Sequence, residues 1–183
     1  MKKSIVGGLV GGLILFIWQF LSWSALNIHG STMTYTPHQD QIMKTITDLN
    51  LEEGEYMMPN LAPGYTPEQQ QVHALDMEGK PWLMLSYKKQ WSNTMGMNMF
   101  RAFIIDFLSA FLICFLLLGN VNLSFMKVLT GCLIVGIISY LTIPYLNSIW
   151  FDTDSIPDLI DAIVQWGLVG AFLGWFLPSK YLS

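Results

Sequence analysis

Four long apolar stretches constrain this chain more than any other feature of its sequence. They cover approximately residues 5–26, 97–118, 126–146 and 156–177. Each is close to the ~20 residues that an α-helix needs to cross a hydrocarbon core of about 30 Å. Only 12% of the 183 residues are charged, against roughly 25% in a soluble domain. We therefore expect an integral membrane α-helical protein with a four-helix transmembrane bundle.

The basic residues beside these stretches predict the orientation of the chain. Lys2 and Lys3 precede the first stretch, Lys127 lies between the second and third, and Lys180 follows the fourth, whereas the connection at 147–158 contains acids and no base. Short basic flanks stay on the cytoplasmic side of a membrane. We expect a multi-pass protein of the bacterial inner membrane, surrounded by the lipid bilayer, with both termini in the cytoplasm.

A cleaved signal peptide is the alternative for the first stretch. Its basic start and the small-x-small pattern Ser22-Trp23-Ser24 permit cleavage. The apolar run is long for a signal peptide, however, and paired glycines with embedded tryptophans favour a retained helix.

Residues 27–96 separate the first two stretches and should form a small α+β extracytoplasmic (periplasmic) cap. The patterns Thr36-Pro37-His38-Gln39 and Thr66-Pro67-Glu68-Gln69 both match a capping box with proline at the first helical position. They predict helices at 37–49 and from residue 67 onward. Apolar and β-branched or aromatic patterning predicts strands at 55–58 and 82–88.

Glycines at four-residue spacing mark the first and fourth stretches. The small-residue positions are Gly7, Gly8, Gly11, Gly12, Gly167, Gly170 and Gly174. Such GxxxG spacing allows two helix backbones to approach closely in a membrane. We expect these faces to be docking grooves, either between the first and fourth helices of one chain, which we favour, or against another subunit of a homo-oligomer.

Polar side chains inside the predicted spans form the candidate functional cluster. Its members are Gln19, Asn98, Arg101, Asp106, Asp158, Asp161 and Gln165. Ionisable groups at membrane depth cost several kcal/mol unless they are paired, so they indicate a site. In one interpretation Arg101 pairs with Asp161 or Asp158 and fixes helix packing. In the other, an outward-facing pocket binds a ligand or relays a proton through Asp106, which would be protonated if left unpaired.

Metal and cofactor signals are weak in this sequence. Met95, Met97 and Met99 alternate before the second span, and thioethers are ligands that suit Cu(I). Methionine is also a general filler of apolar gaps, so we expect no metal site and no cofactor. Cys114 and Cys132 both lie in apolar runs, which argues against a disulfide framework.

The common catalytic motifs do not occur in the sequence, so we expect no enzymatic activity. There is also no basic patch of the kind that nucleic acid requires.

Several short motifs occur in a fixed order along nearly the whole chain. They are GGLVGGLILFIWQFLSW, PHQDQI, EGEYMMP, IPYLNSIWFD and WGLVGAFLGWFLP. In this order they resemble a family of uncharacterised bacterial inner-membrane proteins with four spans and a periplasmic insert after the first helix. The resemblance implies this topology and carries no established activity.

Two functions are compatible with these features. The first is a non-enzymatic envelope accessory or interaction module, which would bind another membrane or periplasmic protein through its cap and small-residue helix faces. The alternative is a protein that binds or transports a small molecule or ion, with or without proton coupling, in a polar pocket around Arg101, Asp106 and Asp161.

Overall fold

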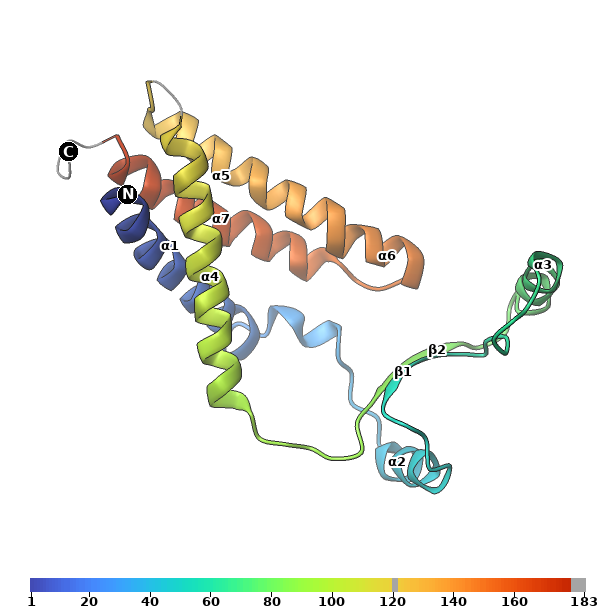
Figure 1. Ribbon diagram of the computed structural model, residues 1–183. Coiled ribbons are helices and arrows are strands. Elements are labelled where there is room, and N and C mark those ends of the chain that lie inside the picture. Colours follow the sequence, from blue (N-terminus) through green and yellow to red (C-terminus); the bar gives the residue numbers. More distant parts are fainter. Residues whose placement is uncertain (120–121, 179–183) are drawn as a thin grey trace. The chain divides into compact units, whose positions relative to one another are not determined.

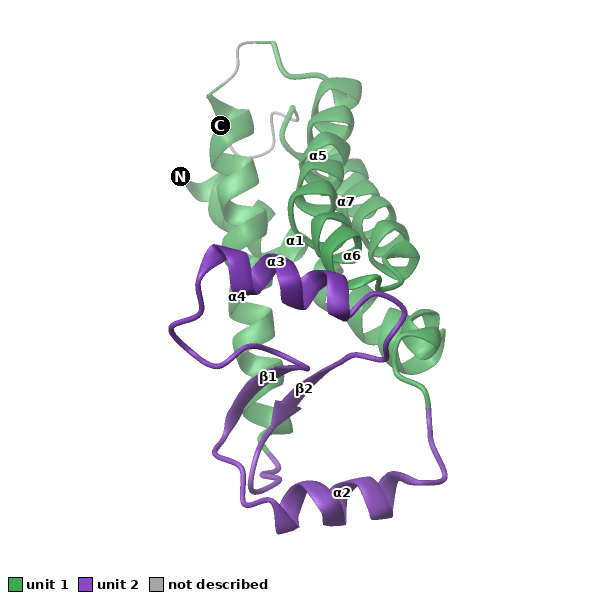
Figure 2. Cartoon of the chain, turned by 90° about the vertical axis from the view of Figure 1, so that its right-hand side faces the viewer, with its two compact units in different colours: residues 1–34, 94–183 green, residues 35–93 purple. Residues whose placement is uncertain are grey.

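The computed structural model describes residues 1–119 and 122–178, so Lys180 lies outside the described residues. The chain divides into two compact units (Figure 2). The helical unit consists of residues 1–34 and 94–183, and the insert unit consists of residues 35–93. The boundary leaves residues 27–34 and 94–96, which we assigned to the cap, within the helical unit.

The helical unit contains the four predicted long helices. The first is α1 (Lys2–Phe20), which continues as a π-helical segment, η1 (Leu21–Ala25). The second is α4 (Met95–Leu118), and the fourth is α7 (Ile156–Phe176). The third begins as α5 (Phe125–Tyr140) and continues through a π-helical segment, η3 (Leu141–Tyr145), into α6 (Leu146–Phe151). All four are long and apolar enough to cross a membrane, which confirms the predicted helices.

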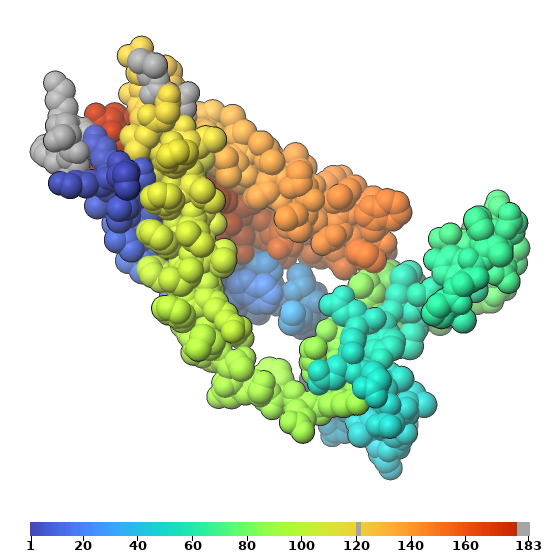
Figure 3. All heavy atoms as spheres, viewed as in Figure 1, coloured from blue at the N-terminus to red at the C-terminus, as the bar shows by residue number. Residues whose placement is uncertain are grey.

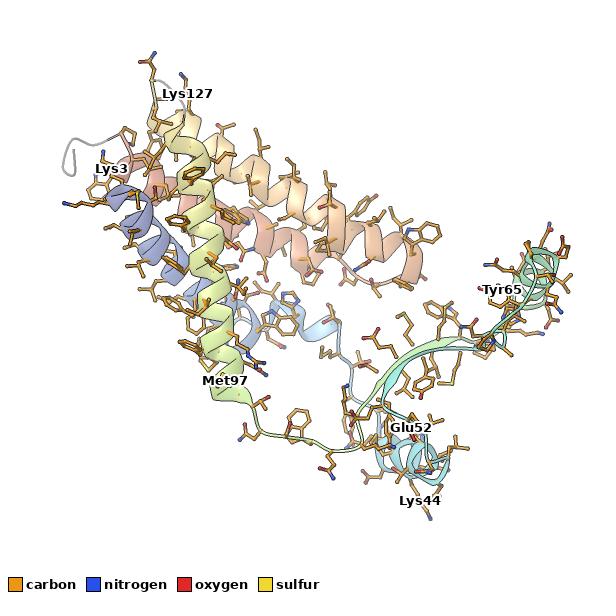
Figure 4. The ribbon with its side chains drawn as sticks, viewed as in Figure 1. Lys3, Lys44, Glu52, Tyr65, Met97 and Lys127 are labelled. Atoms are coloured by element: carbon orange, nitrogen blue, oxygen red, sulfur yellow. The ribbon has the colours of Figure 1, made fainter. Side chains whose placement is uncertain are left out.

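The helices pack as two pairs that share one core. Helix α1 lies along α4, α5 lies along α7, and α1 also contacts α7 (Figure 1). Helices α4 and α5 are close together at the end that carries Lys3 and Lys127 and diverge toward the other end (Figures 1 and 4). The first long helix and α7 stay in contact at that other end, where Ser22 donates to Asp161. The most deeply buried residues of this core are Leu15, Ala110, Cys114, Val128, Cys132, Val169 and Leu173.

The outer surface of the helical unit is also apolar. In the space-filling view, α4 and α5 form much of the face turned toward the reader (Figure 3). Leu112 and Phe115 on α4 and Ile134 and Ile138 on α5 are all exposed. Exposed aliphatic and aromatic side chains on long helices are suited to contact with lipid rather than water.

The glycines of α1 lie against α4. A Cβ atom added to Gly12 would lie 2.7 Å from the N and Cα atoms of Phe107, and one added to Gly8 would lie 2.9 Å from the Cβ atom of Phe111. Gly7 and Gly11 face α4 and also approach Leu173 and Val169 of α7. The closest backbone approach of α1 is therefore to the second long helix and not, as we expected, to the glycines of the fourth.

The glycines of α7 lie against α5. A Cβ atom on Gly170 would lie 2.9 Å from the Cβ atom of Cys132, and one on Gly174 would lie 2.9 Å from the carbonyl oxygen of Phe125. Gly167 has more room, with Leu133 at 3.6 Å. Each groove thus receives the side chains and backbone of a neighbouring helix. The expected contact between the first and fourth helices occurs at Gly7 and Gly11, but the glycines of the two helices do not lie against each other.

The insert unit contains two helices and a two-stranded antiparallel sheet. Its elements are α2 (Gln39–Asp48), β1 (Gly54–Met58), α3 (Pro67–Asp76) and β2 (Leu83–Tyr87), with Tyr56 of β1 opposite Leu85 of β2. Both predicted strands are confirmed. Tyr87 is the one buried residue of this unit, all of which is described, so the unit has almost no core of its own.

One of the two predicted capping boxes is present. The Thr66 hydroxyl accepts from the Gln69 backbone N–H at 3.3 Å, and the Gln69 side chain accepts from the Thr66 N–H at 2.8 Å. The box predicted at Thr36 is wrong: α2 starts at Gln39, and His38 is its N-cap residue. The Gln39 N–H instead donates to the Thr36 carbonyl oxygen and closes a turn before the helix.

Candidate functional site

Asp161, in the second turn of α7, accepts hydrogen bonds from three side chains near the end of the first long helix. Trp18 Nε1 and Ser22 Oγ donate to its Oδ1 atom at 3.0 and 2.6 Å, and His29 Nε2 lies 2.9 Å from its Oδ2 atom. Trp18 and Ser22 are four residues apart and therefore share one helix face. Because the Asp161 side chain is only 13% exposed, these donors replace much of the water that a carboxylate requires.

His29 reaches Asp161 because the chain turns back after the first helix. Asn27 adopts a left-handed conformation with φ of 49°, which asparagine tolerates better than most residues. A short 3₁₀ helix, η2 (Ile28–Ser31), follows and carries His29. The His29 ring stacks on Trp23 with ring centroids 4.0 Å apart and planes within 6°. Ser31 Oγ also donates to Asp154 at 3.2 Å, so the 27–32 segment is bound to the chain on both sides of the start of α7.

A cavity of about 360 Å³ lies beside this network. It is lined by Gln19, Trp23, His29, Ser139, Tyr140, Ile143, Pro144, Asp158, Asp161, Ala162 and Gln165. Asp158 and Asp161 are three residues apart on one face of α7. Among the described residues, no other residue donates a hydrogen bond to the Asp158 carboxylate. The cavity therefore has one carboxylate, Asp161, that three other side chains bind, and one, Asp158, whose only donor among the described residues is its own backbone N–H.

Both π-helical segments border this cavity. Segment η1 contributes Trp23, and η3 contributes Ile143 and Pro144. A π-helical turn changes the direction in which side chains leave a helix, and such turns are frequent at functional sites. Pro144 has no backbone N–H, so it also interrupts the hydrogen bonding of the third long helix. Irregular backbone in two long helices therefore coincides with the polar cavity.

Asp106 of α4 forms a second polar contact close to the first. Gln19 Nε2 donates to its Oδ1 atom at 3.0 Å, while its Oδ2 atom is buried and has no hydrogen-bond partner among the described residues. Gln19 also lines a smaller cavity of about 240 Å³, together with Asn98 and Ala102 of α4. Gln19 therefore lies between the larger cavity, the smaller cavity and Asp106.

The structure brings most of the predicted cluster together but not Arg101. Gln19, Asp158, Asp161 and Gln165 all line the larger cavity. Asn98 donates to Thr94 within its own helix and lines the smaller cavity. The predicted pairing of Arg101 with Asp161 or Asp158 is wrong: Arg101 is exposed and forms no ion pair among the described residues. Helix α4 packs mainly on α1, which itself supplies the donors to Asp161.

Three of the residues that build the site were not in the predicted cluster. His29 lies outside the first apolar stretch, while Trp18 and Ser22 resemble ordinary membrane-helix residues. The available signal was Asp161 itself, because an acid inside an apolar stretch requires donors at the same depth. Ser22 and His29 are near the end of the first apolar stretch, and the structure places this end beside the start of the fourth, where Asp161 lies.

The structure gives no support to a site made of the three methionines. Met95 and Met99 are four residues apart on α4, whereas Met97 is about 200° around the helix from Met95, so the three thioethers do not converge. No group of three or more His, Cys, Asp or Glu residues suited to a metal ion occurs in the described part of the chain. Cys114 and Cys132 are buried free thiols of the core.

Comparisons of the chain with protein-family models, with curated proteins and with solved structures find no match. The resemblance to the four-span inner-membrane family therefore stays a prediction.

Proposed function

We propose that this chain is an integral membrane protein that binds a small organic cation in the cavity between α1, α5 and α7. The observation that carries the proposal is the Asp158 carboxylate, which borders a cavity and receives no hydrogen bond from another described residue. A carboxylate removed from water gains most from a positively charged partner. The cavity volume, about 360 Å³, is near the lower end of the range for small-molecule sites.

The rest of the cavity wall fits a cation that also forms hydrogen bonds. Tyr140, Gln165 and Ser139 supply polar groups, and the Trp23 ring supplies an aromatic surface. Aromatic faces attract cations by about 0.5–2 kcal/mol, depending on how far the cation is desolvated. Asp161 is already bound by Trp18, Ser22 and His29, so it adds negative charge to the wall without being the free acceptor.

The proposed topology places both termini in the cytoplasm and residues 35–93 on the outer side of a bacterial inner membrane. Lys3 and Lys127 lie at one end of the helical unit, and Met97 lies at the opposite end (Figure 4). Basic residues concentrated at one end support a cytoplasmic position for that end. The cavity is then closer to the outer face, because it is lined by the end of α1 and the start of α7.

A matched pair of variants tests the proposed function. Purified protein in lipid nanodiscs is titrated with tetramethylammonium, ethylammonium and guanidinium, and binding is measured by calorimetry and by thermal shift. Asp158→Asn should abolish binding of any cation that the wild-type protein binds. Asp152→Asn is the control, because Asp152 is exposed, does not line the cavity and has a φ of 49°, which asparagine tolerates. Binding that survives in Asp158→Asn would contradict the proposal.

A second candidate function is supported by the insert unit alone. The small-residue faces of α1 and α7 contact α4 and α5, so they are not free for another protein. In the insert unit, by contrast, Met57 and Met84 lie opposite each other across the sheet and are about half exposed, at 50% and 51%. A two-stranded sheet is only marginally stable by itself in water. We propose binding of an envelope protein here as the second function.

This second function predicts that a co-purifying protein depends on the sheet. The double variant Met57→Ser/Met84→Ser should lose such a protein in a mild-detergent pull-down. The cavity variant Asp158→Asn should retain it. The opposite pattern would contradict binding through the insert unit.

A further inference from the structure

The buried carboxylate of Asp106 is not part of the lining of the proposed cavity. Its side chain is on α4, and the residue is only 5% exposed. Oδ1 accepts one hydrogen bond, from Gln19, and Oδ2 is the one buried side-chain oxygen or nitrogen of the described residues without a partner. An ionised carboxylate would need several donors or a positive charge at this depth.

No positive charge faces Asp106 from the elements packed around it. On α4 itself, Arg101 is five residues away, about 140° around the helix, and is exposed. On α1 the polar contact is Gln19, while Lys2 and Lys3 are at the opposite end of that helix. The charged groups of α7 near this level are acids, Asp158 and Asp161, with His29 bound to Asp161.

Helix α5 supplies no compensating charge either. Its single basic residue, Lys127, is in its first turn, where Nζ donates to the Asn122 carbonyl oxygen. Its thiol, Cys132, belongs to the apolar core. The environment of Asp106 therefore favours a neutral carboxylic acid.

We propose that Asp106 is a reversible proton-binding site and that Gln19 connects it to the cavity. On binding, a hydronium ion gives its proton to Oδ2 and leaves as water. On release, the O–H bond breaks and the proton returns to a water molecule. A sodium ion is a poorer occupant, because hard cations take about six or more oxygen ligands and this site offers one carboxylate and one amide. The connection to the cavity rests on the proposed function, whereas the proton site itself does not.

Gln19 couples the protonation of Asp106 to the lining of the cavity. Its amide donates to Asp106, and its side chain lines both cavities. Its neighbours Trp18 and Ser22 bind Asp161. Residues 18–22 of the first long helix thus donate hydrogen bonds both to Asp106 of α4 and to Asp161 of α7. Loss of the proton from Asp106 would increase the demand for the Gln19 donor and so change the wall of the cavity.

Infrared spectroscopy of the whole protein in nanodiscs tests the proton site directly. At neutral pH, the wild-type protein and the Asp152→Asn control should both show the carbonyl stretching band of an undissociated carboxylic acid. Asp106→Asn should lose that band. A wild-type spectrum without the band, or a band that persists in Asp106→Asn, would overturn the proposal.

A second variant keeps the test decisive if Asp106→Asn does not fold. Gln19→Leu removes the amide and leaves Asp106 in place, so the same band should shift because its carbonyl group loses an N–H donor. An unshifted band in Gln19→Leu would exclude the assigned contact.

The connection to the cavity has its own measurement. Binding of tetramethylammonium should depend on pH in the wild-type protein and in Asp152→Asn, and Asp106→Asn should lose that part of the pH dependence. An identical pH profile in Asp106→Asn would refute the connection. If no organic cation binds the wild-type protein, the proposed function and the connection both fail, and the infrared band alone decides whether Asp106 holds a proton.

Discussion

Replacing Gly12 with alanine should weaken the contact between α1 and α4. The added Cβ atom would lie 2.7 Å from the N and Cα atoms of Phe107 and 3.0 Å from the carbonyl carbon of Asp106. These are backbone atoms, so no side chain can rotate away. Because carbon atoms pack at about 3.5–4.0 Å, the two helices would have to separate locally by roughly 1 Å.

The free-energy change follows from two opposing effects. Inserting a methyl group into a close-packed contact costs about 1–3 kcal/mol. Alanine is a better helix former than glycine, which offsets about 0.5–1 kcal/mol of that cost. We expect Gly12→Ala to lower the free energy of unfolding by about 1–2 kcal/mol.

The matched control is Gly167→Ala on α7. There the nearest atom to the added Cβ is Leu133 Cδ2 at 3.6 Å, which is an ordinary contact. This variant should be neutral or slightly stabilising. Both variants are unfolded reversibly in mixed micelles by increasing denaturing detergent, with tryptophan fluorescence as the signal. Equal unfolding free energies for the two variants would refute the packing argument.

Two further predictions concern local order and are measured by hydrogen exchange on the whole chain. Asp161→Asn should speed exchange in residues 27–32 about tenfold, because it removes the charged acceptor of a bond worth about 1.5 kcal/mol, whereas Asp152→Asn should leave that segment unchanged. Thr66→Ala removes a capping hydroxyl worth about 1 kcal/mol and should speed exchange in α3 about fivefold. Thr36→Ala should not affect α2, because the Thr36 hydroxyl accepts from the N–H of His38, which precedes the helix, and not from the first turn of α2; faster exchange in α2 would support the capping box predicted from the sequence.

The parts of the fold that depend on local sequence were predictable. A helix that crosses a membrane needs only a sufficient length of apolar residues, and all four long helices were found this way. The strands and the Thr66 box also depend on residues close together in sequence. The partners of the glycine faces were not predictable, because GxxxG spacing indicates a close approach without specifying which helix approaches.

The acids of the candidate site were predictable from the sequence, but not all of their hydrogen-bond donors were. Asp158, Asp161 and Gln19 stand out because polar residues are unusual in apolar stretches. The donor His29 does not stand out, since it lies beyond the helix and reaches Asp161 through a left-handed turn at Asn27. Opposite charge suggested Arg101 as the partner of Asp161 or Asp158. Charge does not show which helices are neighbours, and α4 packs mainly on α1.

The close approach at Gly12 also explains why Asp106 and Gln19 meet. Helices α1 and α4 run antiparallel, since Gly8 faces Phe111 and Gly12 faces Phe107. Side chains on a helix point toward its N-terminus. Gln19 therefore points back toward Gly12. Because α4 is antiparallel to α1, Asp106 points toward Gln19. Gln19 is seven residues, about 10 Å, beyond Gly12 along α1. The two side chains span this distance because they point toward each other, and they form the 3.0 Å hydrogen bond.

Gly12→Ala should therefore lengthen this bond and shift the carbonyl band of Asp106 in the same direction as Gln19→Leu. A destabilised Gly12→Ala protein with an unshifted band would show that helix packing and the polar site are independent.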